Sequence, residues 1–426
     1  MPDAVHLQAI ELLLSAMYRT RGDDGLENRF LVGPPGAPLW QRRVSTFVFF
    51  RRRSLVRAAL YVRKFGPLHL RSTAMNDIQS QLRSFAIANY GLFATETFLR
   101  QFEESYNERI GHDVKARLAD LLAASELFSP RSCLALYPLV PVVVESDFRS
   151  APFFFLQPRS VAENDTGVRA PAFSSETFPP VANWDARTER PSSWLGIRSP
   201  IIQASNKMKA AILGALALTP HPRYRHQFSM RSMFGGFCSF DARGRLNITF
   251  CEAHTPAMSE DIIVRQSDHD WLSMLALKLE RTDDSNRRQI RALEYFYRAW
   301  PLDSHERFPW LFMTLDAIFG DSSRATQAVI DAIGQNGGTG FDYDRLRLLL
   351  RLRNSVIHGG APDVYDSDRY HQYYEQYGDD PLYDLEVITA QCLRACIFEG
   401  ALVEHPDPHA DLIRAYQDGT LGRRTP

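Results

Sequence analysis

The sequence predicts a mainly helical α+β fold with more than one domain. In the first 125 residues and again after Asp261, apolar side chains recur every three or four positions, which is the period of an amphipathic helix. Between these parts lie short β-branched and aromatic runs cut by prolines, which are typical of strands. The chain has 426 residues, enough for two or three domains of ordinary size. We therefore expect a helical N-terminal region at 1–128, a β-rich or mixed middle region at 129–260 and a helical domain at 261–426.

The N-terminal region carries a basic patch inside its helical pattern. Between Arg42 and Lys64 the sequence has eight basic side chains and no acidic one, interleaved with aromatic residues. Because basic groups neutralise phosphates and aromatic rings stack on bases, this composition suits a groove for single-stranded RNA. A solvated basic face on an amphipathic helix explains the pattern equally well. The arginines that carry the RNA-binding hypothesis are Arg42, Arg43, Arg51, Arg52 and Arg53.

The middle region is expected to contain strands and one long irregular segment. Residues 237–240 and 246–250 are strand-like runs joined by a short loop that ends in Gly244, which predicts a β-hairpin. Residues 157–193 are dense in proline, serine, threonine and charge, which favours an irregular segment or linker.

The composition excludes several classes of protein. The net charge of -1 gives no whole-molecule attraction for nucleic acid, so any such site must be local. The five cysteines are scattered and the first residues lack the pattern of a signal peptide, so we expect a reducing cytoplasm. The longest nearly uncharged apolar run, 210–218, is about half of the roughly 20 residues that a membrane-spanning helix needs. We therefore expect no membrane span.

The sequence indicates neither a metal nor a cofactor. Cys238, Cys251 and His254 would supply three ligands of a structural zinc site, but the fourth is missing, and cysteines packed in a core are the simpler interpretation. The phosphate-binding pattern GxxxxGK is absent, so a nucleotide-hydrolysing motor is not indicated.

The last region is expected to be a bundle of helices with short connections. Pro301 and Gly320 mark where the first two helices end, and Asp342 or Asp344 caps the fourth. An acidic, tyrosine-rich insert at 361–384 precedes the last helix. We favour a solvated loop there over a segment that binds a basic partner or shields a site. Apolar residues within 290–300 and 311–319 mark the first two helices, and the third is expected at 322–333. The fourth ends at Gly359 and Gly360, and the last is expected at 385–403.

The fourth of these helices carries the candidate site. Projected at 100° per residue, its apolar side chains form one stripe that should face a core. Arg353 falls in the middle of this stripe, where a charge is costly unless it is paired or lies at a cleft or interface. The apolar members of the stripe are Leu346, Leu349, Leu350, Val356 and Ile357.

A polar face runs beside the stripe. Arg347, Arg351, Asn354 and His358 follow one another at spacings of four, three and four, so Asn354 and His358 are neighbours. His358 closes the helix, where the dipole favours a charged imidazole suited to proton transfer.

These residues resemble the signature of the HEPN superfamily of metal-independent ribonucleases. RNSVIHGG, residues 353–360, matches its common form RNxxxH, and Arg351 matches a longer spacing to the same histidine. WLFMTLDAIFG, residues 310–320, is similar to the second helix of Apea-like HEPN domains, with Asp316 where the family typically has a glutamate. The resemblance covers residues 286–416, about a third of the chain, and implies a C-terminal HEPN-type helical bundle.

The resemblance implies an endoribonuclease that works without a metal, and the Apea-like family implies a role in bacterial defence by abortive infection. His358 would act as general acid or base, Arg353 would stabilise the charge on the phosphorane, and Asn354 would orient one of them. Arg351 is a secondary catalytic candidate, and Arg347 is expected to contact RNA. The N-terminal region would sense a trigger ligand or protein.

A homodimer with a composite active site is expected. Arg353 and His358 are five helical positions apart, or about 140° around the axis, so one helix aims them in different directions. This agrees with the resemblance, which implies paired motifs. Two other functions stay open: a catalytically inactive HEPN bundle that binds RNA or dimerises, and a partner-binding scaffold. The motif itself has a structural interpretation, in which Arg353 makes a buried salt bridge and His358 only caps its helix.

Overall fold

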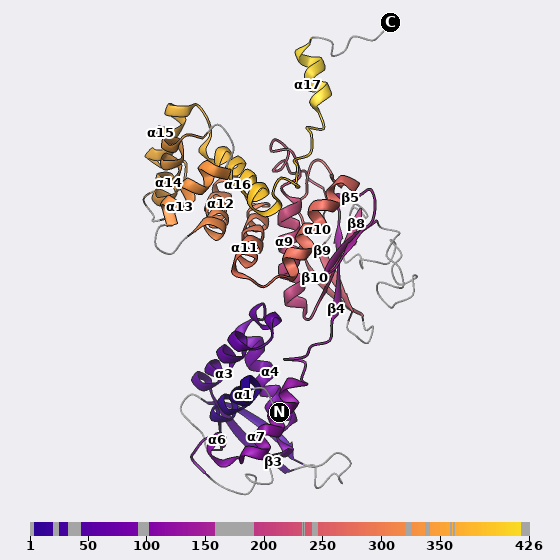
Figure 1. Cartoon of the computed structure of the whole chain (residues 1–426), viewed down its shortest axis with the longest axis vertical. Helices are drawn as coiled ribbons and strands as arrows, with labels where there is room; N and C mark the ends of the chain where they lie inside the picture. The colour runs from indigo at the N-terminus through magenta and orange to yellow at the C-terminus, as the bar shows by residue number, and fades with distance from the viewer. Residues whose placement is uncertain are drawn as a thin grey trace. The chain divides into compact units, whose positions relative to one another are not determined.

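In the computed structural model, the chain divides into two compact units, Met1–Ser132 and Cys133–Pro426 (Figure 1). Its fold is the mainly helical α+β arrangement that the sequence predicts. The expected boundary at 128/129 lies close to the observed division. The structure describes residues 4–19, 25–32, 44–92, 102–157, 191–231, 233, 235–240, 246–320, 325–336, 341–357, 360 and 363–418.

The first unit combines helices with a small antiparallel sheet of order β1-β3-β2. Val48 and Phe50 on the middle strand are buried against Leu13 and Leu55 in one apolar core. Its elements are α1 (Ala4–Ser15), β1 (Met17–Tyr18), β2 (Gly25–Val32), β3 (Val44–Arg51), α3 (Arg52–Phe65), α4 (Met75–Ala88), α6 (Tyr106–Arg109) and α7 (His112–Ala123), with a 3₁₀ turn at Leu68–Arg71.

The helical N-terminal region that the sequence predicts also contains three strands, which were not predicted. The run VSTFVFFR in β3 is β-branched and aromatic, which favours a strand. It leads directly into α3 at Arg52, without the turn residues that usually separate a strand from a helix. The basic residues on both sides of this junction made the two elements resemble one amphipathic helix.

The second unit is built on a six-stranded antiparallel sheet of order β10-β9-β4-β8-β7-β6. The predicted hairpin is confirmed, because Leu246 pairs with Phe240 and Ile248 with Cys238. Most of the irregular segment expected at 157–193 lies outside the described residues. The strands are β4 (Cys133–Leu139), β5 (Val142–Val144), β6 (Phe148–Ser150), β7 (Phe153–Leu156), β8 (Ser193–Ser199), β9 (Gly235–Phe240), β10 (Leu246–Ala253) and β11 (Ile262–Val264), the last of which pairs in parallel with β5.

Helices cover one face of this sheet and continue into a bundle (Figure 1). The helices predicted for the last region are confirmed, although their ends shift by a few residues. Within the described residues, no helix is long and apolar enough to cross a membrane. The helices are α9 (Ile202–Leu216), α10 (His269–Glu280), α11 (Asp284–Ala299), α12 (Ser304–Phe319), α13 (Ala325–Asn336), α14 (Tyr343–Ile357), α15 (Asp368–Tyr377), α16 (Pro381–Phe398) and α17 (Ala410–Gln417), with a 3₁₀ turn at Gln266–Asp268.

The middle region and the last region share one hydrophobic core, so the boundary expected at 260/261 does not separate compact units. The reason is α9, which contacts both β8 and α11. Gly214 of α9 approaches the backbone of Leu293 so closely that a Cβ at this glycine would overlap the Leu293 carbonyl oxygen. Sheet and bundle therefore bury each other's apolar surfaces.

The acidic insert is not a plain solvated loop, because it contains α15. The Ser367 hydroxyl accepts a hydrogen bond from the Arg369 amide at the start of this helix, and Gly378 ends it with a φ of 72°. Val364 and Tyr373 are buried in the core of the unit. The many acidic residues concealed this apolar anchoring in the sequence.

Candidate functional site

Helix α14 begins at a capping aspartate. The Asp342 carboxylate accepts a hydrogen bond from the Arg345 amide at 2.7 Å, so Asp342 is the cap and not Asp344. Leucines on both sides of the helix are buried, since α14 packs against α15 as well as against α12 and α13. Ile357 departs from the predicted stripe, because this last residue of the helix is 46% exposed.

Arg353 has a charged partner from the neighbouring helix. Its Nη2 lies 2.5 Å from Oδ2 of Asp316 on α12, and its guanidinium carbon lies 5.4 Å from the centre of the Phe312 ring. Both charged side chains are partly accessible, at 20% exposure for Arg353 and 29% for Asp316. Burial raises the pKa of Asp316, and Arg353 opposes this rise. Asp316 is thus the acidic partner that a charge in the apolar stripe was expected to need.

Both members of this pair have polar atoms that form no hydrogen bond within the described residues. A guanidinium offers five N–H donors, and among the described residues Arg353 donates to Asp316 alone. Oδ1 of Asp316 is buried and has no hydrogen-bond partner in the described part of the chain. The arrangement therefore holds a guanidinium in one orientation with donors left for an anionic ligand.

The polar face of α14 is exposed, as predicted. Arg347, Arg351 and Asn354 all face solvent. The Arg347 guanidinium lies 4.7 Å from the centre of the Tyr343 ring and donates a hydrogen bond to the Tyr343 hydroxyl. His358 lies outside the described residues, so its position relative to Arg353 stays a prediction.

The N-terminal basic patch lies in the other unit. Arg51, Arg52 and Arg53 are exposed where β3 meets α3, whereas Arg42 and Arg43 lie outside the described residues. The Arg51 guanidinium stacks 3.7 Å from the centre of the Tyr18 ring. Phe50, one of the aromatic residues of the patch, is fully buried and belongs to the core.

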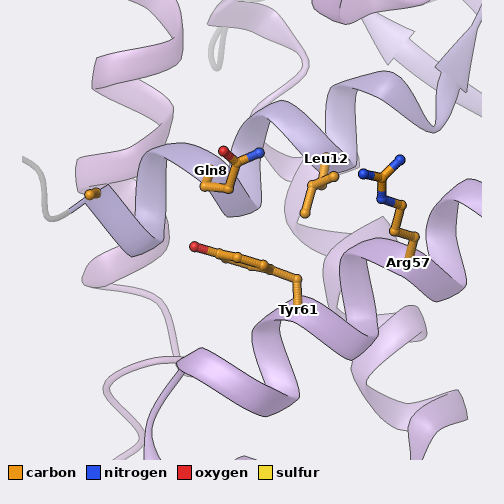
Figure 2. Close-up of a pocket in the computed structure, with 5 residues that line it drawn as sticks. Gln8, Leu12, Arg57 and Tyr61 are labelled. Atoms are coloured by element: carbon orange, nitrogen blue, oxygen red, sulfur yellow. The ribbon is translucent and has the colours of Figure 1, made fainter.

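Beside this patch lies an open depression of about 470 Å³ between α1 and α3. Gln8 and Leu12 of α1 face Arg57 and Tyr61 of α3 across it (Figure 2). Sequence reasoning did not single out Gln8 or Leu12, because a pattern along one helix does not show which helix packs opposite.

The zinc interpretation does not fit the geometry of His254. Its Nε2 donates to the Gly236 carbonyl oxygen at 2.6 Å, and its Nδ1 accepts from the Lys209 amine at 3.2 Å. Burial lowers the pKa of His254 to about 3 and raises that of Cys238 to about 12. Both ring nitrogens are engaged and the thiol is protonated at neutral pH. In the described part of the chain, no group of three or more potential ligands could hold a metal ion.

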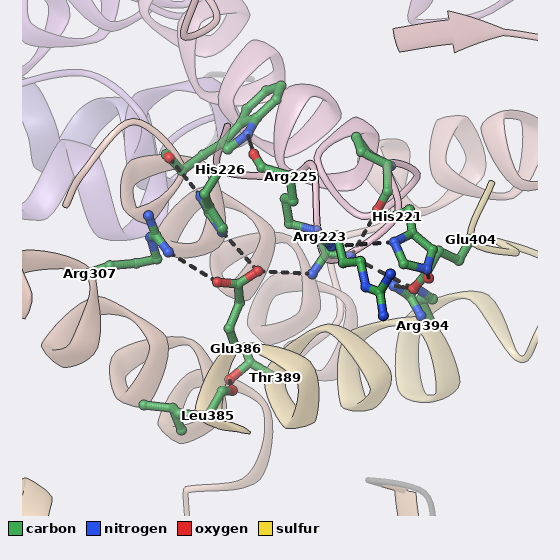
Figure 3. Close-up of polar contacts among 12 residues, drawn as sticks. His221, Arg223, Arg225, His226, Arg307, Leu385, Glu386, Thr389, Arg394 and Glu404 are labelled. Carbon is green, nitrogen blue, oxygen red and sulfur yellow. Dashed lines mark hydrogen bonds and ion pairs between the residues drawn. The ribbon is translucent and has the colours of Figure 1, made fainter. Parts of the chain in front are cut away.

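A buried ionic network around Glu386 of α16 was not predicted (Figure 3). Its carboxylate lies 3.0 Å from Arg307 of α12, 3.4 Å from Arg225 and 3.0 Å from His226. Burial alone would raise the pKa of Glu386, but His226 and the two arginines hold it below its usual value. Burial lowers the pKa of His226, which Glu386 opposes.

The network continues to the segment before α17. Glu404 lies 2.6 Å from Arg394 of α16 and 3.9 Å from Arg225. His405 lies 3.3 Å from Asp268. These contacts join three distant parts of the chain and pair each buried charge with an opposite one, so we interpret the network as structural.

Comparisons with protein-family models, with characterised proteins and with solved structures find no match to this chain.

Proposed function

We propose that this chain is a metal-independent endoribonuclease of HEPN type. The observation that carries the proposal is the Arg353–Asp316 pair: a half-buried arginine, fixed by one acid from the adjacent helix, with donors left over. It lies on the same helix as the exposed Arg351 and Asn354, five residues before His358. Guanidinium donors of this kind suit the bidentate recognition of a phosphate.

The proposed reaction is a transesterification within the RNA. The ribose 2′-oxygen attacks the adjacent phosphorus, the bond from phosphorus to the 5′-oxygen breaks, and the products are a 2′,3′-cyclic phosphate and a 5′-hydroxyl end. One base removes the 2′-hydroxyl proton and one acid protonates the leaving oxygen, and His358 performs one of these steps. Arg353 stabilises the charge that develops on the phosphorane. Because the RNA supplies its own nucleophile, the proposal requires no metal.

The remaining residues of the face have supporting roles in this proposal. Asn354 orients the histidine or the arginine, Arg351 is a secondary catalytic candidate and Arg347 contacts the RNA backbone. Asp316 positions the Arg353 guanidinium through the contact at 2.5 Å.

The proposed active species is a homodimer. Five helical positions correspond to about 140° around an axis, so a regular helix that reached His358 would aim it away from Arg353, and two α14 helices related by a twofold axis would complete one site. The exposed row of Arg347, Arg351 and Asn354 is available for such a contact. We place this activity in the cytoplasm, in bacterial defence, with the first unit sensing a trigger ligand or protein.

The second candidate is an inactive bundle that binds RNA or a partner. The Asp316 carboxylate favours it, since an arginine already paired with an acid is also what a purely structural role requires.

The deciding experiment incubates purified protein with a labelled structured RNA, with and without EDTA, beside the all-DNA counterpart. The nuclease proposal expects cleavage that survives chelation, cyclic-phosphate ends, uncut DNA and a loss of about a hundredfold or more in His358→Ala. Arg369→Ala, an exposed change on α15, serves as the control variant. Inhibition by EDTA that a divalent ion reverses would overturn the mechanism, and a purified protein that binds RNA without cutting it would favour the inactive bundle.

A further inference from the structure

The outward face of α11 and α12 carries a row of arginines interleaved with aromatic rings. Arg288, Arg291, Tyr295 and Arg298 follow one another on α11 at spacings of three, four and three, so they share one helix face. Trp310 of α12 lies beside them, with its ring centre 5.9 Å from that of Tyr295. We call these five residues the arginine–aromatic strip.

The arginines of the strip stack on its rings. The Arg291 and Arg298 guanidinium carbons each lie 5.9 Å from the centre of the Tyr295 ring, and that of Arg298 lies 5.5 Å from Trp310. Both arginines are exposed, and the two rings are partly exposed. Such stacking orders the charged groups without neutralising them.

The strip keeps an excess of positive charge. Among the described residues, neither Arg291 nor Arg298 forms an ion pair within 4 Å of a carboxylate. The neighbouring acid is Glu294, and burial raises the pKa of its carboxyl, although the charges of Lys207 and the two arginines oppose the rise. In a protein with a net charge of -1, this is a local basic surface.

One end of the strip reaches the last turn of α12, which also carries Asp316. Arg288 donates to the carbonyl oxygens of Ala317, at 3.0 Å, and Gly320, at 2.5 Å, at the end of α12. Ala317 adjoins Asp316, the partner of Arg353. Met313 lies on α12 between Trp310 and Asp316 in sequence and is 38% exposed. From Arg288 to Arg298 the helix runs for about 15 Å.

We propose that the arginine–aromatic strip binds single-stranded RNA, with its arginines on the phosphates and its rings stacked on bases, and leads the strand to Arg353. This assignment rests on the proposed nuclease function and adds the surface that holds its substrate. The combination of ordered cations with accessible rings matches a nucleic-acid strand, which alternates anionic phosphates with planar bases.

The first test measures binding without cleavage. A fluorescent single-stranded 2′-O-methyl RNA, which lacks the attacking hydroxyl, is titrated by anisotropy over a series of salt concentrations. Arg291→Ala/Arg298→Ala should weaken binding by about tenfold or more and reduce the slope of log K against log salt by roughly 1.4, or 0.7 for each phosphate contact. The control Arg281→Ala/Arg414→Ala removes the same charge from exposed sites elsewhere in this unit. Equal affinity and slope in the two double variants would overturn the proposal.

The second test separates stacking from charge. Tyr295→Leu should weaken binding about tenfold while Tyr295→Phe retains it, because only the leucine lacks a ring. Thermal unfolding monitored by circular dichroism shows whether each variant is folded. If polyglutamate displaces the protein as effectively as RNA does, the strip is a site for acidic protein and the assignment is overturned.

The failure of this proposal is distinguishable from failure of the nuclease. A wild-type protein that binds the 2′-O-methyl strand through the strip but cleaves no RNA refutes only the nuclease. A wild-type protein that cleaves RNA, while Arg291→Ala/Arg298→Ala cleaves with unchanged kcat and KM, refutes only the strip. The expected result is a raised KM with an unchanged kcat in that double variant.

Discussion

A catalytic role and a structural role of the contact between Arg353 and Asp316 predict different effects of mutation on the cleavage rate and on the free energy of unfolding. If the pair is only structural, its value is that of a partly exposed salt bridge, about 0–1 kcal/mol. The exposures of 20% and 29% place it in that class. Because burial raises the pKa of Asp316, the arginine does not fully offset the cost of desolvating this carboxylate. The pair is therefore expected to contribute little to the free energy of unfolding.

Catalysis predicts a far larger effect on rate. Removing a group that stabilises charge in the transition state typically costs about 100- to 1000-fold in kcat, or about 2.7–4 kcal/mol. Arg353→Ala should lose this much, whereas Asp316→Asn, which leaves the guanidinium in place, should lose about tenfold or less. Arg353→Lys keeps the charge but lacks the planar fork, so we expect an intermediate loss.

The assay combines initial rates of RNA cleavage with urea unfolding followed by tryptophan fluorescence. We expect both Asp316→Asn and Arg353→Ala to change the free energy of unfolding by less than about 2 kcal/mol. The reasoning is refuted if Arg353→Ala cleaves RNA at the wild-type rate. It is also refuted if the two variants lose activity equally and in proportion to their loss of stability.

Four further predictions concern the rest of the chain. Glu386→Gln leaves two buried arginines without their carboxylate and should destabilise the second unit by about 3–5 kcal/mol, whereas Asp411→Asn, in a pair exposed by 72% and 96%, should cost under about 1 kcal/mol in the same urea experiment. Because the pKa of Glu386 is lowered in the folded protein, its carboxylate stabilises the fold at pH values above the ordinary glutamate pKa. This stabilisation is lost as the pH falls through the pKa of the folded state. The melting temperature should therefore fall on acidification, and less steeply in Glu386→Gln. Reversing the charge of Arg51, Arg52 and Arg53 should weaken RNA binding and flatten its salt dependence without changing the products, and an unchanged salt slope would show a solvated face. Light scattering alongside activity should find a dimer, and a monomer that cleaves at full rate on dilution would refute the composite site.

Local patterns predicted much of the fold because helical periods, caps and breakers are encoded within a few turns of chain. Gly320 ends α12 and Asp342 caps α14, both as the sequence indicates. The strand β3 was missed because a basic run crosses its junction with α3. Helix α15 was missed because the buried Tyr373 is surrounded by acids and other exposed tyrosines.

The candidate site was predicted in part, for a physical reason. A lone arginine in an apolar stripe requires a partner, so the sequence showed that Arg353 is unusual, but the identity of that partner depends on how two helices pack. Asp316 lies 37 positions away. The Glu386–Arg225 contact spans 161 positions and leaves no periodic signal in either segment. Pairings of this kind are set by tertiary packing, which no local pattern contains.

The two ionic systems of the second unit differ in what they leave available. The Glu386 side chain is only 5% exposed and lies within 4 Å of Arg307, Arg225 and His226. Its negative charge is therefore balanced by groups of the protein itself. Arg353 has a single acid beside it, and most of its five N–H donors remain unused among the described residues. A buried network whose charges are paired with one another stabilises one packing of the helices, and a half-buried arginine with spare donors retains the capacity to bind an anion. This contrast, more than the motif alone, favours α14 over the Glu386 network as the anion-binding surface that the proposed function requires.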